Sequence, residues 1–145
     1  MLYGILALIT FAIAMASHHA PTIKYGILML LSWAASNLCV ASLGFERAPI
    51  LIIPIDGVIA LWVAQVAFKG ASKVGVAIFL LFAEEMAVHC VAFLTYATGH
   101  AGYWMALNVI FATQVLINGT AGVSHGLAYW SDRLRHIPHS AMSRR

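Results

Sequence analysis

The sequence predicts an all-α integral membrane protein, because it is rich in apolar residues, poor in charge and organised into long apolar runs. Hydrophobic residues make up 62% of the 145 residues and charged residues only 9%, against about 25% charged in a soluble domain. Most of the runs approach or exceed the roughly 20 residues that a helix needs to cross a bilayer. These observations exclude an ordinary soluble protein and predict a bundle of transmembrane helices.

The first apolar run is the shortest. It covers residues 2–16 and ends in Ala14-Met15-Ala16, a spacing of small residues that resembles a signal-peptidase site. A signal peptide begins with a positively charged segment, and no Lys or Arg precedes this run. We therefore expect a retained first span, tilted or partly interfacial, with a four-span bundle as the alternative if this segment does not cross.

The remaining runs are separated by polar segments that contain proline, glycine or charge. Pro21 and Pro49 are expected to break the chain in the turns at 17–22 and 44–49. Lysine and glycine mark the next turns, at 69–73 and 97–102. We expect a bundle over residues 1–130 and a basic cytoplasmic tail over 131–145, with spans at about 2–16, 23–43, 50–68, 74–97 and 103–127.

The basic residues predict the orientation of these spans. With five spans, one side of the membrane carries every Lys and Arg except Arg47: Lys24, Lys69, Lys73, Arg133, Arg135, Arg144 and Arg145. Cytoplasmic segments carry the excess of Lys and Arg in membrane proteins. The N-terminus is therefore expected outside and the C-terminus in the cytoplasm, in the inner membrane of a bacterium. Basic residues scattered at the ends of runs form no patch, so we expect no nucleic-acid partner despite a net charge of +3.

Acidic residues inside the spans are the most informative feature of the sequence. Asp56, Glu84 and Glu85 lie within apolar runs, and a charge at that depth costs at least about 2.5 kcal/mol on insertion scales. No Lys or Arg lies deep in a span to pair with them. Burial without a cation disfavours the charged form of a carboxyl group, so at least one of the two glutamates is expected to be protonated.

Further polar residues lie at comparable depths in several spans. Glu85 and His89 are four residues apart and share a helix face, which suits a Glu–His hydrogen bond, a proton step or a wet lumen. Gly122 and Gly126 form a G-x-x-x-G spacing that favours close helix packing. We predict an intramembrane polar centre from these spans, consisting of Glu84, Glu85, His89, Asp56, Asn37, Gln114 and Asn118.

This polar centre admits three interpretations. Its carboxyl and amide groups can hold helices together within the bundle or between protomers. They can form a proton or ion path, because intramembrane ionisable groups are commonly functional. They can also bind a ligand or cofactor. A haem held by His89 or His125 is the cofactor alternative, although their different depths make a shared haem geometrically poor. Otherwise we expect no cofactor and no metal site.

Enzymatic motifs are not evident in the chain. There is no H-E-x-x-H, G-x-S-x-G or phosphate-binding loop. His136 and His139 stand three residues apart in the tail without further ligands, which is too little to indicate a metal site. A non-enzymatic membrane protein is therefore expected.

The overall format resembles that of small multi-spanning phage and prophage membrane proteins, including holins. The resemblance lies in the short length, the spans with internal polar residues such as those at 108–125, and the charged tail at 131–145. It implies a protein that oligomerises in the bilayer to permeabilise the inner membrane or conduct across it. The alternative is an accessory subunit of a respiratory or photosynthetic membrane complex, with the polar groups as a proton relay, quinone site or subunit contact.

Overall fold

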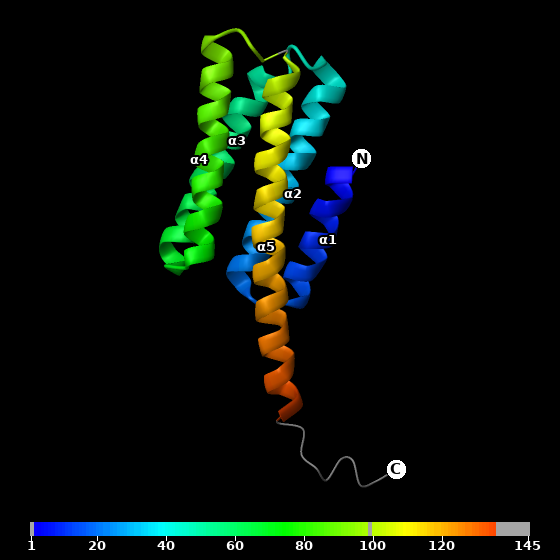
Figure 1. The fold of residues 1–145 in the computed structure, drawn as a ribbon, viewed down its shortest axis with the longest axis vertical. Coiled ribbons are helices and arrows are strands. Elements are labelled where there is room, and N and C mark those ends of the chain that lie inside the picture. The colour runs from blue at the N-terminus through cyan, green and yellow to red at the C-terminus, as the bar shows by residue number, and fades with distance from the viewer. Residues whose placement is uncertain (1, 99, 136–145) are drawn as a thin grey trace.

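The computed structural model describes residues 2–98 and 100–135, with side chains from Gly4 onward. Over these residues the chain is helical, without strands, and short turns join the helices (Figure 1). This confirms the predicted all-α class. The helices are α1 (Leu2–Ala16), α2 (Ala20–Leu43), α3 (Pro49–Gly70), α4 (Lys73–Leu94) and α5 (Ala101–Arg135).

Four of these helices, α2 to α5, are long and apolar enough to cross a membrane. Helix α1 has 15 residues, which gives a length of about 22 Å at 1.5 Å per residue, short of a hydrocarbon core of about 30 Å. The described residues therefore form a multi-pass helix bundle with four full-length spans and one shorter apolar helix packed beside them.

Two prolines act differently from the prediction. Pro21 and Pro49 were expected to end helices in turns, but each lies in the first turn of a helix, α2 and α3. The first turn suits proline, because the backbone N–H that proline lacks would have no helical partner there. Helix α3 also continues through Pro54. The prolines start helices here, and the turns before them are correspondingly shorter.

The ends of α4 and α5 also differ from the predicted spans. Helix α4 ends at Leu94, and the exposed Tyr96 has a left-handed backbone (φ 54°), so the span predicted to reach residue 97 is shorter. Helix α5 continues past the predicted boundary at 127 to Arg135, because no Gly or Pro interrupts residues 127–135. The first residues of the predicted tail are thus helical. Residues 136–145, with Arg144 and Arg145, lie outside the described residues.

The helices run alternately up and down (Figure 1). The α1–α2 turn, the α3–α4 turn and the projecting part of α5 lie at one end of the bundle, the lower end in Figure 1. This end carries the basic residues Lys24, Lys69, Lys73, Arg133 and Arg135, whereas Arg47 lies between α2 and α3 at the other end. The basic residues therefore segregate as the sequence analysis expects, and the cytoplasmic location of this end stays a prediction.

A large apolar cluster lies in the interior of the bundle. It joins α2, α3, α4 and α5 through Tyr25, Leu28, Met29, Ile59, Val63, Ile78, Phe82, Phe111 and Val115. Large apolar side chains also cover the outside: Leu61, Phe68, Leu94 and Leu116 are each at least 66% exposed. An apolar exterior around an apolar core is the pattern of a protein whose solvent is lipid.

Helix α1 packs against α2 and α5 in the half of the bundle nearest the basic end (Figure 1). Its residue Gly4 lies against the ring of Trp33, and a Cβ on Gly122 of α5 would lie 3.0 Å from Ile13 Cγ2. The other half of the α2–α5 groove is not covered by α1. This arrangement leaves a cavity beside the polar interior.

Candidate functional site

Three ionisable side chains converge inside the bundle. Asp56 of α3 and Glu85 and His89 of α4 each offer one oxygen or nitrogen atom, and these atoms all lie within 4.8 Å of one another. The exposed fractions of the three residues are 1%, 6% and 0%. We call these three residues the Asp–Glu–His centre.

The three residues occupy positions that apolar residues hold elsewhere on the same helix faces. On α3 the buried positions before and after Asp56 are Ile52 and Ile59, at helical spacing. On α4, Glu85 and His89 continue the buried stripe that begins with Ile78 and Phe82. Helix periodicity alone therefore turns these polar side chains inward.

A polar partner from another helix holds each member of the centre. Ser32 Oγ donates to Asp56 Oδ1 at 2.6 Å, and Gln114 Nε2 donates to Glu85 Oε2 at 3.2 Å. The two nitrogens of His89 are both engaged: Nδ1 lies 2.8 Å from Tyr103 Oη, and Nε2 lies 3.3 Å from Asp56 Oδ2. Ser32, Asp56, His89 and Tyr103 thus form one hydrogen-bonded chain that links α2, α3, α4 and α5.

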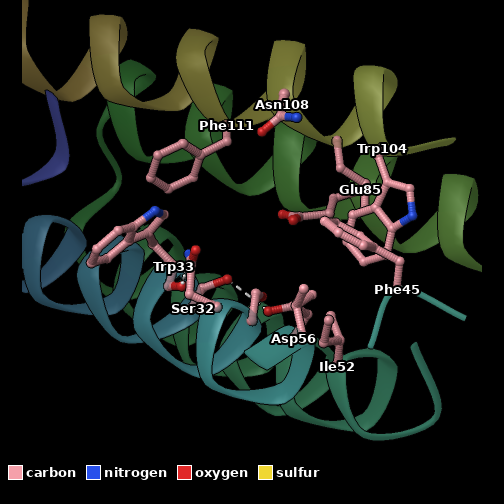
Figure 2. A pocket seen from close by; sticks show the side chains of 13 residues that line it. Ser32, Trp33, Phe45, Ile52, Asp56, Glu85, Trp104, Asn108 and Phe111 are labelled. Atoms are coloured by element: carbon pink, nitrogen blue, oxygen red, sulfur yellow. Dashed lines mark hydrogen bonds between the residues drawn. The ribbon is translucent and has the colours of Figure 1, made fainter. Parts of the chain in front are cut away.

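A cavity of about 220 Å³ lies next to the centre, between α2 and α5. Asp56 and Glu85 are its acidic lining residues, and Figure 2 shows the carboxyl group of Glu85 pointing into it. Its other polar lining residues are Ser32, Ser36, Asn37 and Asn108. Aromatic rings line much of the remainder: Trp33, Phe45, Trp104 and Phe111. The site thus combines two carboxyl groups with an aromatic enclosure.

The structure brings together four of the residues of the predicted polar centre, namely Asp56, Glu85, His89 and Gln114. The other three lie apart from them. Glu84 is exposed on the outer face of α4. Asn37 is exposed at the cavity, where its Nδ2 donates to the backbone oxygen of Trp33. Asn118 is buried, but its Nδ2 donates to the backbone oxygen of Thr22, toward the basic end.

The structure shows the contacts that two sequence patterns make. Of the three possibilities for the face shared by Glu85 and His89, the direct hydrogen bond is not made in the described structure, because His89 contacts Asp56 and Tyr103 while Glu85 contacts Gln114. The Gly122–Gly126 pair, expected to promote helix packing, lies against α1 in the same chain: added Cβ atoms would meet Ile13 and Ser17. These small residues allow α1 and α5 to approach closely within one protomer.

A haem held jointly by His89 and His125 does not fit this geometry. His89 contacts Tyr103, near the start of α5, whereas His125 stacks on His19 near the basic end, with ring centroids 3.8 Å apart. Tyr103 and His125 are 22 residues apart on one helix, which corresponds to about 33 Å. The two histidines therefore cannot be the axial ligands of one haem.

Sequence reasoning missed Tyr103 and Ser32 as members of the site. Tyr103 opens the fifth span, a position that favours an interfacial anchor, and its inward direction depends on how α5 packs against α4. Ser32 looked like an ordinary small residue of a span, although its four-residue spacing to Ser36 and then Val40 marks the face that lines the cavity. Only the packing of the helices identifies these partners.

The donors at the site suit the binding of a cation. Two carboxyl groups and an imidazole can accept a proton or coordinate a metal ion, and the Lys and Arg side chains of the described residues lie toward the ends of the helices. Within the described residues, His89 Nε2 lies 3.3 Å from Asp56 Oδ2, a contact that becomes an ion pair when the imidazole is protonated. Comparison of the chain with protein-family models, with curated proteins and with solved structures finds no match.

Proposed function

We propose that this chain is a small, non-enzymatic membrane protein that conducts a cation across the bacterial inner membrane through its Asp–Glu–His centre. The observation that carries the proposal is the burial of two carboxyl groups and an imidazole within one protomer, next to a cavity. Ionisable groups are costly in a membrane interior, and where they occur they usually mark a path for ions or protons.

The hydrogen bonds around the centre support this proposal. The carboxyl groups face the cavity between α2 and α5, and His89 connects Asp56 with Tyr103, two residues from the start of α5. A cation that entered the cavity would reach Asp56 and Glu85 in its wall. Beyond them, His89 and Tyr103 continue a polar connection toward the end of the bundle opposite the basic end.

A second candidate function is the holin-like one, in which several copies assemble to permeabilise the membrane. The observation that favours it is Glu84, which lies on the outer face of α4 at nearly the same depth as Glu85. A carboxyl group that faces lipid costs at least about 2.5 kcal/mol, so a contact with a second protein chain at this position would be stabilising. A partner subunit of a larger membrane complex could fill the same role.

The two glutamates allow one experiment to separate these functions. The chain would be expressed alone in a bacterium while membrane potential and culture density are recorded. Parallel cultures would carry Glu85→Gln, which changes the inward carboxyl group, or Glu84→Gln, which changes the outward one. Equal amounts of protein in the membrane, measured by immunoblot, make the cultures comparable.

Each result points to a different conclusion. Depolarisation that Glu85→Gln abolishes and Glu84→Gln preserves would support conduction through the Asp–Glu–His centre. Depolarisation that depends on Glu84 alone would favour the oligomeric, permeabilising assembly. Undisturbed cells with the wild-type chain stably inserted would refute both autonomous functions and direct attention to the accessory-subunit alternative.

A further inference from the structure

The distances in the Asp–Glu–His centre match those between the ligands of a metal ion. Asp56 Oδ2 and His89 Nε2 are 3.3 Å apart. Two ligands bound to a tetrahedral metal ion at 2.0–2.1 Å lie about 3.3 Å from each other. One Glu85 oxygen lies within 4.8 Å of one ligand atom each from Asp56 and His89, so a small movement of this side chain would complete a three-ligand set.

Each of the three side chains is oriented by a hydrogen bond to a residue outside the centre. Ser32 holds Asp56, Tyr103 holds His89 through Nδ1, and Gln114 holds Glu85. In metal sites, a ligating histidine typically bonds a second group through its other ring nitrogen, and ligating carboxylates are hydrogen-bonded in turn. Here these partners leave Asp56 Oδ2 and His89 Nε2 facing each other at 3.3 Å, with Glu85 beside them.

The position of Glu85 also fits a ligand. The residue is 6% exposed, and its Oε2 accepts the hydrogen bond from Gln114 Nε2. The carboxyl group points into the cavity of about 220 Å³ (Figure 2). A water molecule takes up about 30 Å³ of liquid volume, so the cavity has room for water ligands beside a metal ion.

We propose that Asp56, Glu85 and His89 bind a divalent transition-metal ion of the zinc type, with water as a further ligand. Two carboxylates and a neutral imidazole carry a charge of −2, which such an ion balances. The mixed nitrogen and oxygen donors suit Zn²⁺, Mn²⁺, Fe²⁺ or Co²⁺ better than Ca²⁺ or Mg²⁺, which prefer oxygen alone. This inference rests on the proposed function, because it names the cation that the Asp–Glu–His centre binds.

The test is a titration of the purified full-length chain in detergent with Co²⁺, whose visible absorption reports its ligands. We expect one tight site that Zn²⁺ displaces and excess Mg²⁺ does not. His89→Gln and Glu85→Gln should abolish this site, whereas Glu84→Gln, the outward neighbour, should preserve it. The double variant His136→Ala with His139→Ala should also preserve it, since the proposed ligands are Asp56, Glu85 and His89.

A positioning variant distinguishes weakened metal binding from loss of folding. Tyr103→Phe keeps all three ligands and removes only the hydroxyl group near His89 Nδ1. Loss of such an orienting hydrogen bond typically weakens metal binding 10- to 100-fold. Circular dichroism would confirm that each variant keeps its helices. A single-site affinity for Co²⁺ that is unchanged by His89→Gln and Glu85→Gln, or the absence of stoichiometric binding to the wild type, would overturn the proposal.

The metal site and the conducting function can fail separately. Depolarisation that depends on Glu85, from a chain that binds no Co²⁺ or Zn²⁺, would overturn the metal site and keep the function with another cation. Stoichiometric Co²⁺ binding that requires Glu85, from a chain that does not depolarise cells, would keep the site and overturn the conducting function.

Discussion

Glu84 and Glu85 are consecutive in the sequence but lie on different faces of α4: Glu85 is 6% exposed beside Asp56, and Glu84 is exposed on the outside of the bundle. Successive residues of a helix point about 100° apart, so two adjacent carboxyl groups cannot share one environment. Only Glu85 belongs to the Asp–Glu–His centre. Glu84 belongs to the surface that meets lipid or another protein chain.

The first prediction concerns assembly through Glu84. Replacing Glu84 with Leu removes a polar group from the outer face of α4 and should weaken any oligomer by about 1–2 kcal/mol, the range for interhelical polar contacts in membranes. Chemical crosslinking in the membrane, followed by gel analysis, measures the oligomeric fraction. Ala87→Leu, a change on the same exposed face without loss of a polar group, serves as the control. Equal crosslinking of the wild type and Glu84→Leu would contradict the role of Glu84.

The second prediction concerns the serine that holds Asp56. Ser32→Ala removes the 2.6 Å hydrogen bond to Asp56 Oδ1 and leaves a buried carboxyl oxygen without its donor. The expected cost is about 1–3 kcal/mol in the free energy of unfolding, measured by denaturant titration in detergent micelles. Ser36→Ala, one turn further along α2 at the cavity, should change stability by less than about 0.5 kcal/mol. Similar losses in the free energy of unfolding for Ser32→Ala and Ser36→Ala would show that the hydrogen bond to Asp56 is not the cause of the destabilisation.

The sequence was sufficient for the class of fold and for the direction of several helix faces. Long apolar runs establish four spanning helices, and the spacing of Glu85 and His89 establishes their shared face. Local chemistry also places Pro21 and Pro49 in the first turns of α2 and α3, although proline alone equally indicates a break. Such features depend on residues within one or two turns of each other, which is why sequence reasoning reaches them.

The partners across helices were beyond the reach of the sequence. Asp56 contacts His89, which is 33 residues away in the sequence. Asn118 contacts Thr22, which is 96 residues away, and this contact joins α5 to α2. Which faces meet depends on the rotation and depth of every helix in the bundle, to which distant residues all contribute. For the same reason Asn37 and Asn118 could be identified as intramembrane polar residues but not separated from the centre. Helix geometry allows only one of Glu84 and Glu85 to face the centre, and the packing of α4 determines that it is Glu85.

The third prediction concerns the close packing of α1 on α5. A Cβ on Gly122 would lie 3.0 Å from Ile13 Cγ2 and 3.5 Å from the backbone nitrogen of Ala14. Gly122→Val should therefore force the helices apart and destabilise the protein by about 1–3 kcal/mol, as overpacking does elsewhere. Gly119→Val is the matched control, because a Cβ there would meet Thr10 at an ordinary 3.8 Å. Unfolding of both variants in detergent, followed by circular dichroism, measures the difference; equal stability would contradict the close approach.

The last prediction concerns pH at the basic end of the bundle. His19, in the turn between α1 and α2, stacks on His125 of α5 with ring centroids 3.8 Å apart, and its Nδ1 lies 2.7 Å from Thr22 Oγ1. Burial, and then the proximity of His125, lower the pKa of His19 below its ordinary value of 6.5. His18 in the same turn packs on Tyr129 and Trp130, so a second imidazole faces α5 here.

The sign of the pH effect follows from this lowered pKa. Between the folded and unfolded pKa values of His19 the unfolded state binds more protons, so the contact is stable above about pH 6.5 and is lost as the pH falls through that window. Hydrogen exchange of the α1–α2 turn, corrected for intrinsic rates, should therefore increase between pH 7.5 and 5.5. His125→Asn removes the imidazole that stacks on His19 and should reduce this pH dependence. The α3–α4 turn, which contains no histidine, provides the internal reference; an equal response of both turns would contradict the role of His19.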